Sequence, residues 1–162
     1  MDTDRIEKRV LLRATQSRVW QALTDFKQFG SWFGLKLDRP FAAGEKVRGV
    51  IARSTVDPAS SRVSSQYEGR PFEFVIDRIE PERLFSFRWH PAAIEAGVDY
   101  SAEPMTLVTF TLELQPGGVL LVVTESGFDE IPTARREAAF KMNEGGWTIQ
   151  IERIEKYLAH VS

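Results

Sequence analysis

The chain has 162 residues, 43% of them hydrophobic, which is the size of one ordinary domain, so we predict that residues 1–162 form a single domain. It contains no cysteine, which excludes disulfides, thiolate nucleophiles and cysteine metal sites. Its 21 basic and 23 acidic residues give a net charge of −2 without a basic, aromatic-rich run, so we expect no nucleic-acid partner. We find no apolar stretch of about 20 residues and no basic-then-apolar N-terminus, and we therefore expect a cytoplasmic protein with no membrane partner.

The N-terminal third predicts one strand and two short helices. Residues 5–13 are aliphatic and β-branched between charged residues, a pattern typical of a strand. Thr15 is a suitable N-cap for a first helix, and Asp25 is one for a second. Four large rings then crowd into eight positions: Phe26, Phe29, Trp32 and Phe33. These rings either pack into a sheet or line a cavity, and the pattern alone leaves both possibilities open.

The middle of the chain predicts antiparallel strands separated by two unusual connections. A strand at about 46–52 precedes the segment 53–70, whose five serines indicate a mobile loop or a frayed hairpin. Two alternating strands follow around a turn at 80–82, with large apolar residues on one face: Phe72, Phe74, Ile76, Phe85, Phe87 and Trp89. The connection at 91–104 is longer than a tight turn requires, which is typical of a lid or the edge of a site.

The C-terminal third predicts two more strands and one long helix. Residues 106–114 alternate in polarity and residues 119–124 are almost continuously aliphatic. From about 132 to 160, apolar residues recur at helical intervals, namely Phe140, Trp147, Ile151, Ile154 and Leu158. The elements together predict an α+β helix-grip fold, in which a curved antiparallel sheet of about seven strands wraps a long C-terminal helix.

Two features of the predicted helix bear on function. The pair Gly145-Gly146 costs about 1 kcal/mol per glycine relative to alanine, so we expect a bend or a close approach of another backbone there. Arg136 and Asn143 project from the same side as the apolar residues, which mixes polar and apolar groups in the upstream half of this face. That half therefore faces a cavity, a water molecule or a ligand, or else it is exposed to solvent after a shift of helical phase.

Six segments of the chain, in this order, resemble a known superfamily: residues 19–24, 32–33, 80–89, 107–110, 124–128 and 145–147. They resemble the SRPBCC, or START-like helix-grip, superfamily, and within it the homologues of the activator of heat-shock-protein-90 ATPase. No single segment is specific, but the ordered set covers almost the whole chain. The serine-rich segment 53–70 departs from the family pattern.

The resemblance implies a seven-stranded sheet that grips the C-terminal helix around a cavity for apolar molecules. It places seven residues in the cavity or at its mouth: Trp32, Phe87, Trp89, Glu125, Phe128, Asn143 and Trp147. The ring clusters and the helix face add four further candidate ligand-binding residues, Phe33, Phe74, Arg136 and Phe140. Eukaryotic chaperone activators of this family carry an extra N-terminal domain, which we do not expect here because the sequence opens directly on its first strand.

Few residues are candidates for catalysis. The sequence contains no phosphate loop, zinc-protease helix motif, nucleophile elbow or calcium loop, and we expect neither a metal nor a cofactor. Glu125 is in phase with the aliphatic strand before it, so we predict a buried carboxylate that is paired or neutral, with Arg136 as its partner. His90 follows the end of a strand and is a second candidate for a catalytic acid or base. Three polar residues of the 91–104 connection are expected to be solvated, namely Asp99, Tyr100 and Glu103.

Three functions are compatible with these patterns. The first is non-catalytic binding of a small hydrophobic or aromatic molecule, such as a lipid or polyketide, with Glu125, Asn143 and Arg136 orienting its polar end. The second is a stress-related interaction protein that activates a chaperone. The third is a cyclase, hydratase or isomerase that uses Glu125 or His90 as acid or base. We expect a monomer or a homodimer in each case.

Overall fold

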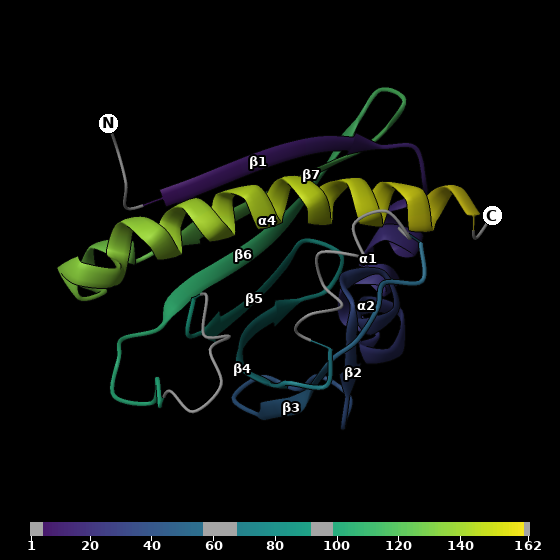
Figure 1. Cartoon of the computed structure of the whole chain (residues 1–162). Coiled ribbons are helices and arrows are strands. Elements are labelled where there is room, and N and C mark those ends of the chain that lie inside the picture. The colour runs from purple at the N-terminus through teal and green to yellow at the C-terminus, as the bar shows by residue number, and fades with distance from the viewer. Residues whose placement is uncertain (1–4, 57–67, 92–98, 161–162) are drawn as a thin grey trace.

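The computed structural model describes residues 5–56, 68–91 and 99–160 (Figure 1). Its elements are β1 (Arg5–Leu12), α1 (Gln16–Thr24), α2 (Phe26–Phe33), β2 (Leu35–Leu37), β3 (Lys46–Ile51), β4 (Pro71–Glu80), β5 (Leu84–Trp89), β6 (Thr106–Gln115), β7 (Gly118–Ser126), the 3-10 helix η1 (Phe128–Glu130) and α4 (Thr133–His160). The predicted α+β helix-grip fold is confirmed. Most of the serine-rich segment and the first half of the 91–104 connection lie outside the described residues.

Within the described residues, the sheet has seven strands in the order β1-β7-β6-β5-β4-β3-β2, and all the pairs are antiparallel. Because β1 and β2 are at opposite edges, the two short helices between them carry the chain from one edge to the other. The β4–β5 register shifts between Ile76 and Arg78, an irregularity of the kind that bends a sheet. Figure 1 shows α4 lying along the sheet, with α1 and α2 near its C-terminal end.

Local signals fix the ends of the short helices. Thr15 accepts a hydrogen bond from the backbone N–H of Arg18, and Asp25 accepts from the backbone N–H groups of Lys27 and Gln28. Gly34 ends α2 in the left-handed conformation with φ of 99°, which favours glycine. Strand β2 follows at once. It was not predicted, because three residues are too few to show alternation.

Aromatic rings fill the space between the sheet and the helices. Phe74 and Phe87 lie 4.7 Å apart between ring centroids, and Phe85 stacks on Phe110 at 6.1 Å. All four are fully buried. Trp32 is also buried and donates its indole N–H to the backbone oxygen of Ala22 at 2.8 Å. Of the predicted ligand-binding residues, Trp32, Phe74 and Phe87 therefore belong to the packed core.

Helix α4 buries the face that its periodicity predicts. Trp147, Ile154 and Leu158 are buried, and Phe140 and Ile151 pack against the core from half-buried positions. None of the described helices is long and apolar enough to cross a bilayer. The helix continues unbroken through Gly145-Gly146. Outside the backbone of the helix itself, no described atom lies within 4 Å of the position that a Cβ would take at either glycine, so the described residues show no close approach of another backbone.

Replacing Gly145 with alanine is expected to raise the free energy of unfolding by about 1 kcal/mol, because alanine has the higher helix propensity and the site has room for its methyl group. Urea denaturation measures the change. Gly118→Ala is the contrasting variant, since its Cβ would lie 2.2 Å from the backbone oxygen of Leu12, and it is expected to destabilise. A loss of stability in Gly145→Ala would contradict a regular, uncrowded helix at this point.

Candidate functional site

A cleft of about 450 Å³ opens between the β3–β5 part of the sheet and helix α4. Its apolar wall is formed by Phe33, Pro71, Phe72, Trp89 and Met142. Three of these rings contact one another, with centroid distances of 5.7 Å for Phe72–Trp89, 6.1 Å for Phe33–Trp89 and 6.4 Å for Phe33–Phe72. The cleft thus continues the aromatic core outward to the surface.

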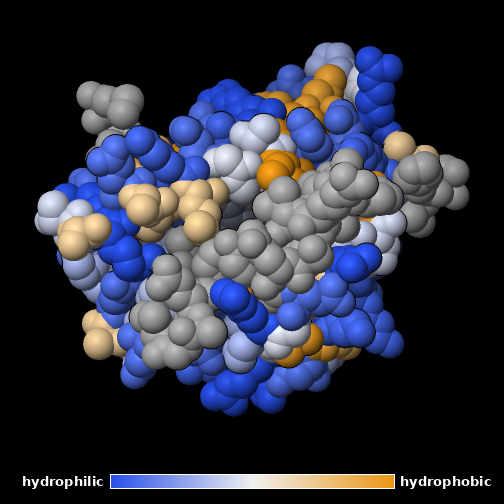
Figure 2. Space-filling model, viewed as in Figure 1, coloured by the Kyte–Doolittle hydropathy of each residue, from blue (hydrophilic) through white to orange (hydrophobic). Residues whose placement is uncertain are grey.

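The rest of the lining consists of Gly49, Tyr100 and six polar or charged residues, namely Arg48, Glu73, His90, Asp99, Ser101 and Asn143. Hydrogen bonds from Ser101, first from its side chain and then from its backbone N–H, lower the pKa of Asp99, so this carboxylate keeps its charge to a lower pH than an ordinary aspartate. In the view of Figure 2, the described part of the surface is mostly hydrophilic, with hydrophobic residues in separate patches.

Trp89 and Asn143 form what we call the inner wall of the cleft. Glu125 on β7 lies behind this wall and is fully buried. Its two carboxylate oxygens accept hydrogen bonds from the indole Nε1 of Trp89 (2.7 Å) and of Trp147 (2.8 Å), from Thr106 Oγ1 (2.6 Å) and from Asn143 Nδ2 (3.0 Å to each oxygen). We call these five residues the Glu125 cluster. It joins α4 to strands β5, β6 and β7 through one carboxylate.

Strand register explains how the cluster assembles. Along β7, side chains alternate between the inner and outer faces, which puts Glu125 on the inner face with the buried Val123. In the register of β6 and β7, Glu125 lies opposite Val108, and Thr106 is two residues from Val108 on the same face of β6. In the register of β5 and β6, Thr106 lies opposite Trp89. Three strands therefore bring their polar groups to one point under the helix.

The cluster is complementary to an ionised carboxylate. The two indole N–H groups and the Asn143 amide N–H₂ can only donate, so they match the lone pairs of a carboxylate and cannot accept a proton from a carboxylic acid. A buried charge without hydrogen bonds would cost several kcal/mol, and these neutral donors offset that cost. Glu125 is thus paired, as expected, but by neutral groups.

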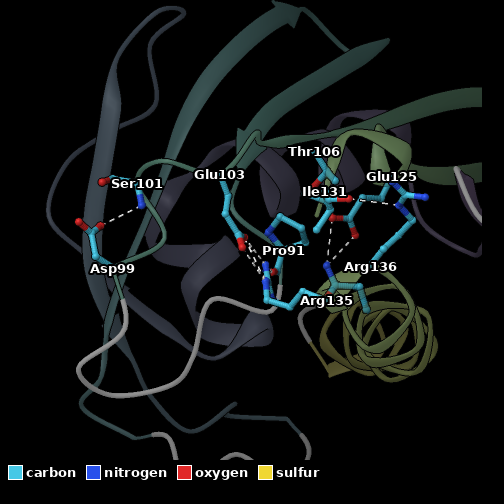
Figure 3. A network of polar contacts seen from close by, with 10 residues as sticks. Pro91, Asp99, Ser101, Glu103, Thr106, Glu125, Ile131, Arg135 and Arg136 are labelled. Atoms are coloured by element: carbon cyan, nitrogen blue, oxygen red, sulfur yellow. Dashed lines mark hydrogen bonds and ion pairs between the residues drawn. The ribbon is translucent and has the colours of Figure 1, made fainter. Parts of the chain in front are cut away.

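The predicted ion pair between Glu125 and Arg136 is wrong. Arg136 donates from Nη2 to the backbone oxygen of Asp129 (2.8 Å) and from Nε to that of Ile131 (3.2 Å), as Figure 3 shows in part. The physical reason is its position in the first turn of α4, directly after η1, where free carbonyl groups are the nearest acceptors.

The neighbouring Arg135 makes the ion pair that the sequence did not predict (Figure 3). Its guanidinium contacts Glu103 through Nη2 (2.7 Å) and Nε (3.0 Å to each oxygen), donates to the backbone oxygen of Pro91 (2.8 Å) and lies 4.9 Å over the ring of Tyr100. The Arg135 and Glu103 side chains are 26% and 20% exposed, so the expectation of a solvated Glu103 is also wrong. These contacts fix the cleft edge to α4.

Arg135→Met is expected to lower the free energy of unfolding by about 1–2 kcal/mol, because it removes charge-assisted hydrogen bonds that are largely shielded from water. Hydrogen exchange at the backbone N–H groups of Ser101 and Glu103 is expected to accelerate as the cleft edge loosens. Arg9→Met is the matched control, since Arg9 is exposed and should change neither quantity. Unchanged exchange in Arg135→Met would contradict this role.

Apart from Arg136, described above, the structure distributes the predicted ligand-binding residues over three environments. Phe33, Trp89 and Asn143 line the cleft, with Glu125 and Trp147 behind them. The core holds Trp32, Phe74 and Phe87, as described above. Phe128 and Phe140 pack on each other at 5.2 Å beneath the start of α4.

Two further cleft residues, Phe72 and Met142, were not singled out as candidates. Phe72 was visible only as one of the alternating rings of its strand. Met142 is 47% exposed and lies one residue from Asn143 on the helix. The second catalytic candidate, His90, lines the cleft, and its Nδ1 is buried without a hydrogen-bond partner in the described part of the chain.

Comparison with known proteins relates this fold and site to a family. The model of the family described as activator of Hsp90 ATPase homolog 1-like protein matches residues 13–159. No curated protein matches the chain significantly. Protein MLL2253 from Mesorhizobium loti is similar in structure, with 22% identity, a TM-score of 0.70 and coverage of 98% of each chain.

Two further solved structures share the fold. DynU16, a putative protein in the dynemicin biosynthetic locus, has 24% identity and a TM-score of 0.67, over 96% of this chain and 47% of DynU16. The Aha1 dimer from Colwellia psychrerythraea has 14% identity and a TM-score of 0.65, over 95% of each chain. At these identities the similarity establishes a common fold and leaves function to the site itself.

Proposed function

Because this chain belongs to the family of activator of Hsp90 ATPase homolog 1-like proteins, which have the helix-grip fold, we propose that it binds a small aromatic or hydrophobic molecule in the cleft beside α4. The observation that carries the proposal is the ring wall of Phe33, Phe72 and Trp89. These rings contact one another and border an opening of about 450 Å³. That volume is within the range of pockets that enclose drug-sized ligands, roughly 300–1,000 Å³.

The Glu125 cluster supports the proposal by preorganising the wall. Trp89 and Trp147 lie 5.7 Å apart with their planes inclined by 30°, and both indoles donate to the same carboxylate. A ring held on one side by a hydrogen bond and on the other by a neighbouring ring loses little further freedom when a ligand stacks on it. Glu125 therefore has a positioning role in this proposal.

The same geometry favours binding over acid–base turnover. Glu125 is fully buried and receives four donors, which leaves it little capacity to take a proton from a substrate. His90 lies at the cleft, but no described residue accepts or donates a hydrogen bond at Nδ1 to orient it as a base. We therefore place the alternative of a cyclase, hydratase or isomerase behind ligand binding.

The similarity to DynU16 supports a ligand from biosynthesis, because that protein is described as part of a biosynthetic locus. The family description favours a second candidate, stimulation of a chaperone ATPase. An ATPase assay with the cognate heat-shock protein separates the two. Stimulation at micromolar concentrations would support the interaction protein, and its absence together with ligand binding would support the first proposal.

Titration with the neutral, environment-sensitive dye N-phenyl-naphthylamine tests the proposal directly. We expect a saturable rise in fluorescence with one site per chain. Phe72→Ala is expected to weaken dye affinity about tenfold, because it removes one ring of the wall. Leu114→Ala is the matched control, since Leu114 is an apolar residue at the end of β6 and is 67% exposed. The absence of saturable binding, or equal affinities for wild type and Phe72→Ala, would contradict a ligand site in the cleft.

A further inference from the structure

The hydrogen-bond donors of the inner wall are already occupied. Trp89 and Asn143 both line the cleft, yet the indole N–H of Trp89 and the amide N–H₂ of Asn143 point to Glu125, at 2.7 Å and 3.0 Å. A ligand that enters the cleft therefore meets the ring face of Trp89 and the remaining amide oxygen of Asn143. Neither of these groups donates a hydrogen bond.

Two acceptors remain without partners among the described residues. Asn143 Oδ1 makes no hydrogen bond, and its orientation is fixed because the oxygens of Glu125 can accept only from the N–H₂ end of the amide. His90 Nδ1 is buried and also makes none, and it accepts when the ring proton is on Nε2. A buried polar atom without a partner, as His90 Nδ1 is, costs free energy, which a donor on a ligand would recover.

The charges around the cleft disfavour anions. Glu125 is buried behind Trp89 and Asn143, and Asp99 is an acidic residue in the cleft lining whose pKa is lowered by hydrogen bonds from Ser101. Two basic residues lie on the opposite side, but Arg48 and Lys46 both pair with Glu73, at 3.5 Å and 3.8 Å. A carboxylate on a ligand would face two acidic groups and would find no free donor on the inner wall.

We infer that the cleft selects planar aromatic molecules that carry a neutral hydrogen-bond donor, with phenols as the chemical class, and discriminates against aromatic carboxylates. Asn143 Oδ1 and His90 Nδ1 accept the hydrogen bond, and the ring wall of Phe33, Phe72 and Trp89 holds the aromatic body. This inference rests on the proposed function of the same cleft and adds the group that the cleft recognises.

Three probes of similar size test the inference by isothermal titration of the full-length protein: 2-naphthol, its methyl ether and 2-naphthoate. The ether keeps the ring and the oxygen but lacks the donor, and the naphthoate replaces the donor with a charge. We expect 2-naphthol to bind about tenfold more tightly than the ether, because one buried hydrogen bond contributes about that factor to affinity. We expect naphthoate to bind most weakly of the three.

His90→Phe assigns the acceptor, because it keeps an aromatic ring and removes Nδ1. We expect the preference for 2-naphthol over its ether to fall at least threefold in this variant, with the affinity for the ether nearly unchanged. Thr148→Ala, at an exposed position of α4 outside the cleft lining, is the control and should retain the wild-type preference. A thermal melt of each variant confirms that the comparison is made on folded protein.

The outcomes separate this inference from the proposed function. Equal affinities for 2-naphthol and its ether, or tighter binding of naphthoate, would overturn the inference while leaving ligand binding intact. An unchanged preference in His90→Phe would overturn the assignment to His90. Failure of all three probes and of the dye would overturn the proposed function itself.

Discussion

Glu125→Ala is expected to lower the free energy of unfolding by about 3–5 kcal/mol, since the substitution leaves two indole N–H groups, an amide and a hydroxyl without their acceptor. Each buried donor without a partner costs about 1–3 kcal/mol, and water that enters the vacated space offsets part of the sum. Urea denaturation followed by circular dichroism measures the loss. Glu144→Ala, on an exposed position of α4, is the control and should change little.

Glu125→Gln distinguishes the charge from the shape of this side chain. Glutamine keeps one acceptor oxygen but turns an N–H₂ group toward indole and amide N–H groups, which cannot accept from it, so we expect a loss of about 2 kcal/mol, smaller than for alanine. A stable Glu125→Gln variant would show that the cluster does not depend on a full carboxylate, and would contradict the account given for its ionised form.

Phe87→Ala is expected to lower the free energy of unfolding by about 3–5 kcal/mol, which is typical of a truncated core phenylalanine. Its ring is fully buried and lies 4.7 Å from Phe74, 5.1 Å from Trp89, and 5.8 Å and 6.1 Å from Phe85 and Phe110, all between centroids. The neighbouring rings are held by the sheet and cannot collapse fully into the vacated volume.

The contrast with Phe72→Ala tests the division between core and cleft. Phe72 is half-buried at the cleft, so its truncation is expected to reduce dye affinity strongly and stability by only about 1 kcal/mol. Phe87→Ala is expected to show the opposite, namely a large loss of stability and a smaller loss of dye affinity. Dye binding is measured at a temperature where the variant is folded. A loss below about 1 kcal/mol in Phe87→Ala would indicate that its ring borders an opening.

Much of the fold could be predicted because its signals are local. Period-two alternation located β4, β5 and β6, and a continuous aliphatic run located β7, all to within three residues. The helical recurrence that ends at Leu158 located α4 to within one residue. Caps at Thr15 and Asp25 placed the short helices correctly. Strand β2 was missed because it pairs through backbone groups over only three residues, which leave no pattern in side chains.

The site was harder to predict because it depends on contacts between distant segments. Alternation along β7 correctly predicted a buried Glu125, but its partners are chosen by strand register and by the position of α4 above the sheet. Arg135 and Arg136 are adjacent in sequence, and only the position of Glu103 in the folded chain decides which one it meets. Likewise, nothing local distinguishes the core ring of Trp32 from the cleft ring of Trp89.

The central claim is that a ligand binds against Trp89 in the cleft, and the indole N–H signals in a proton–nitrogen correlation spectrum test it most directly. The chain has four tryptophans, so four signals report on four positions. Titration with 2-naphthol is predicted to shift the signals of Trp89 and Trp147, whose indoles share Glu125, with saturation at one equivalent. The signals of Trp20 on α1 and of Trp32, bound to the Ala22 carbonyl in the core, should stay unchanged. Saturable shifts at Trp20 or Trp32 with a silent Trp89, or no saturable shift at all, would contradict the account.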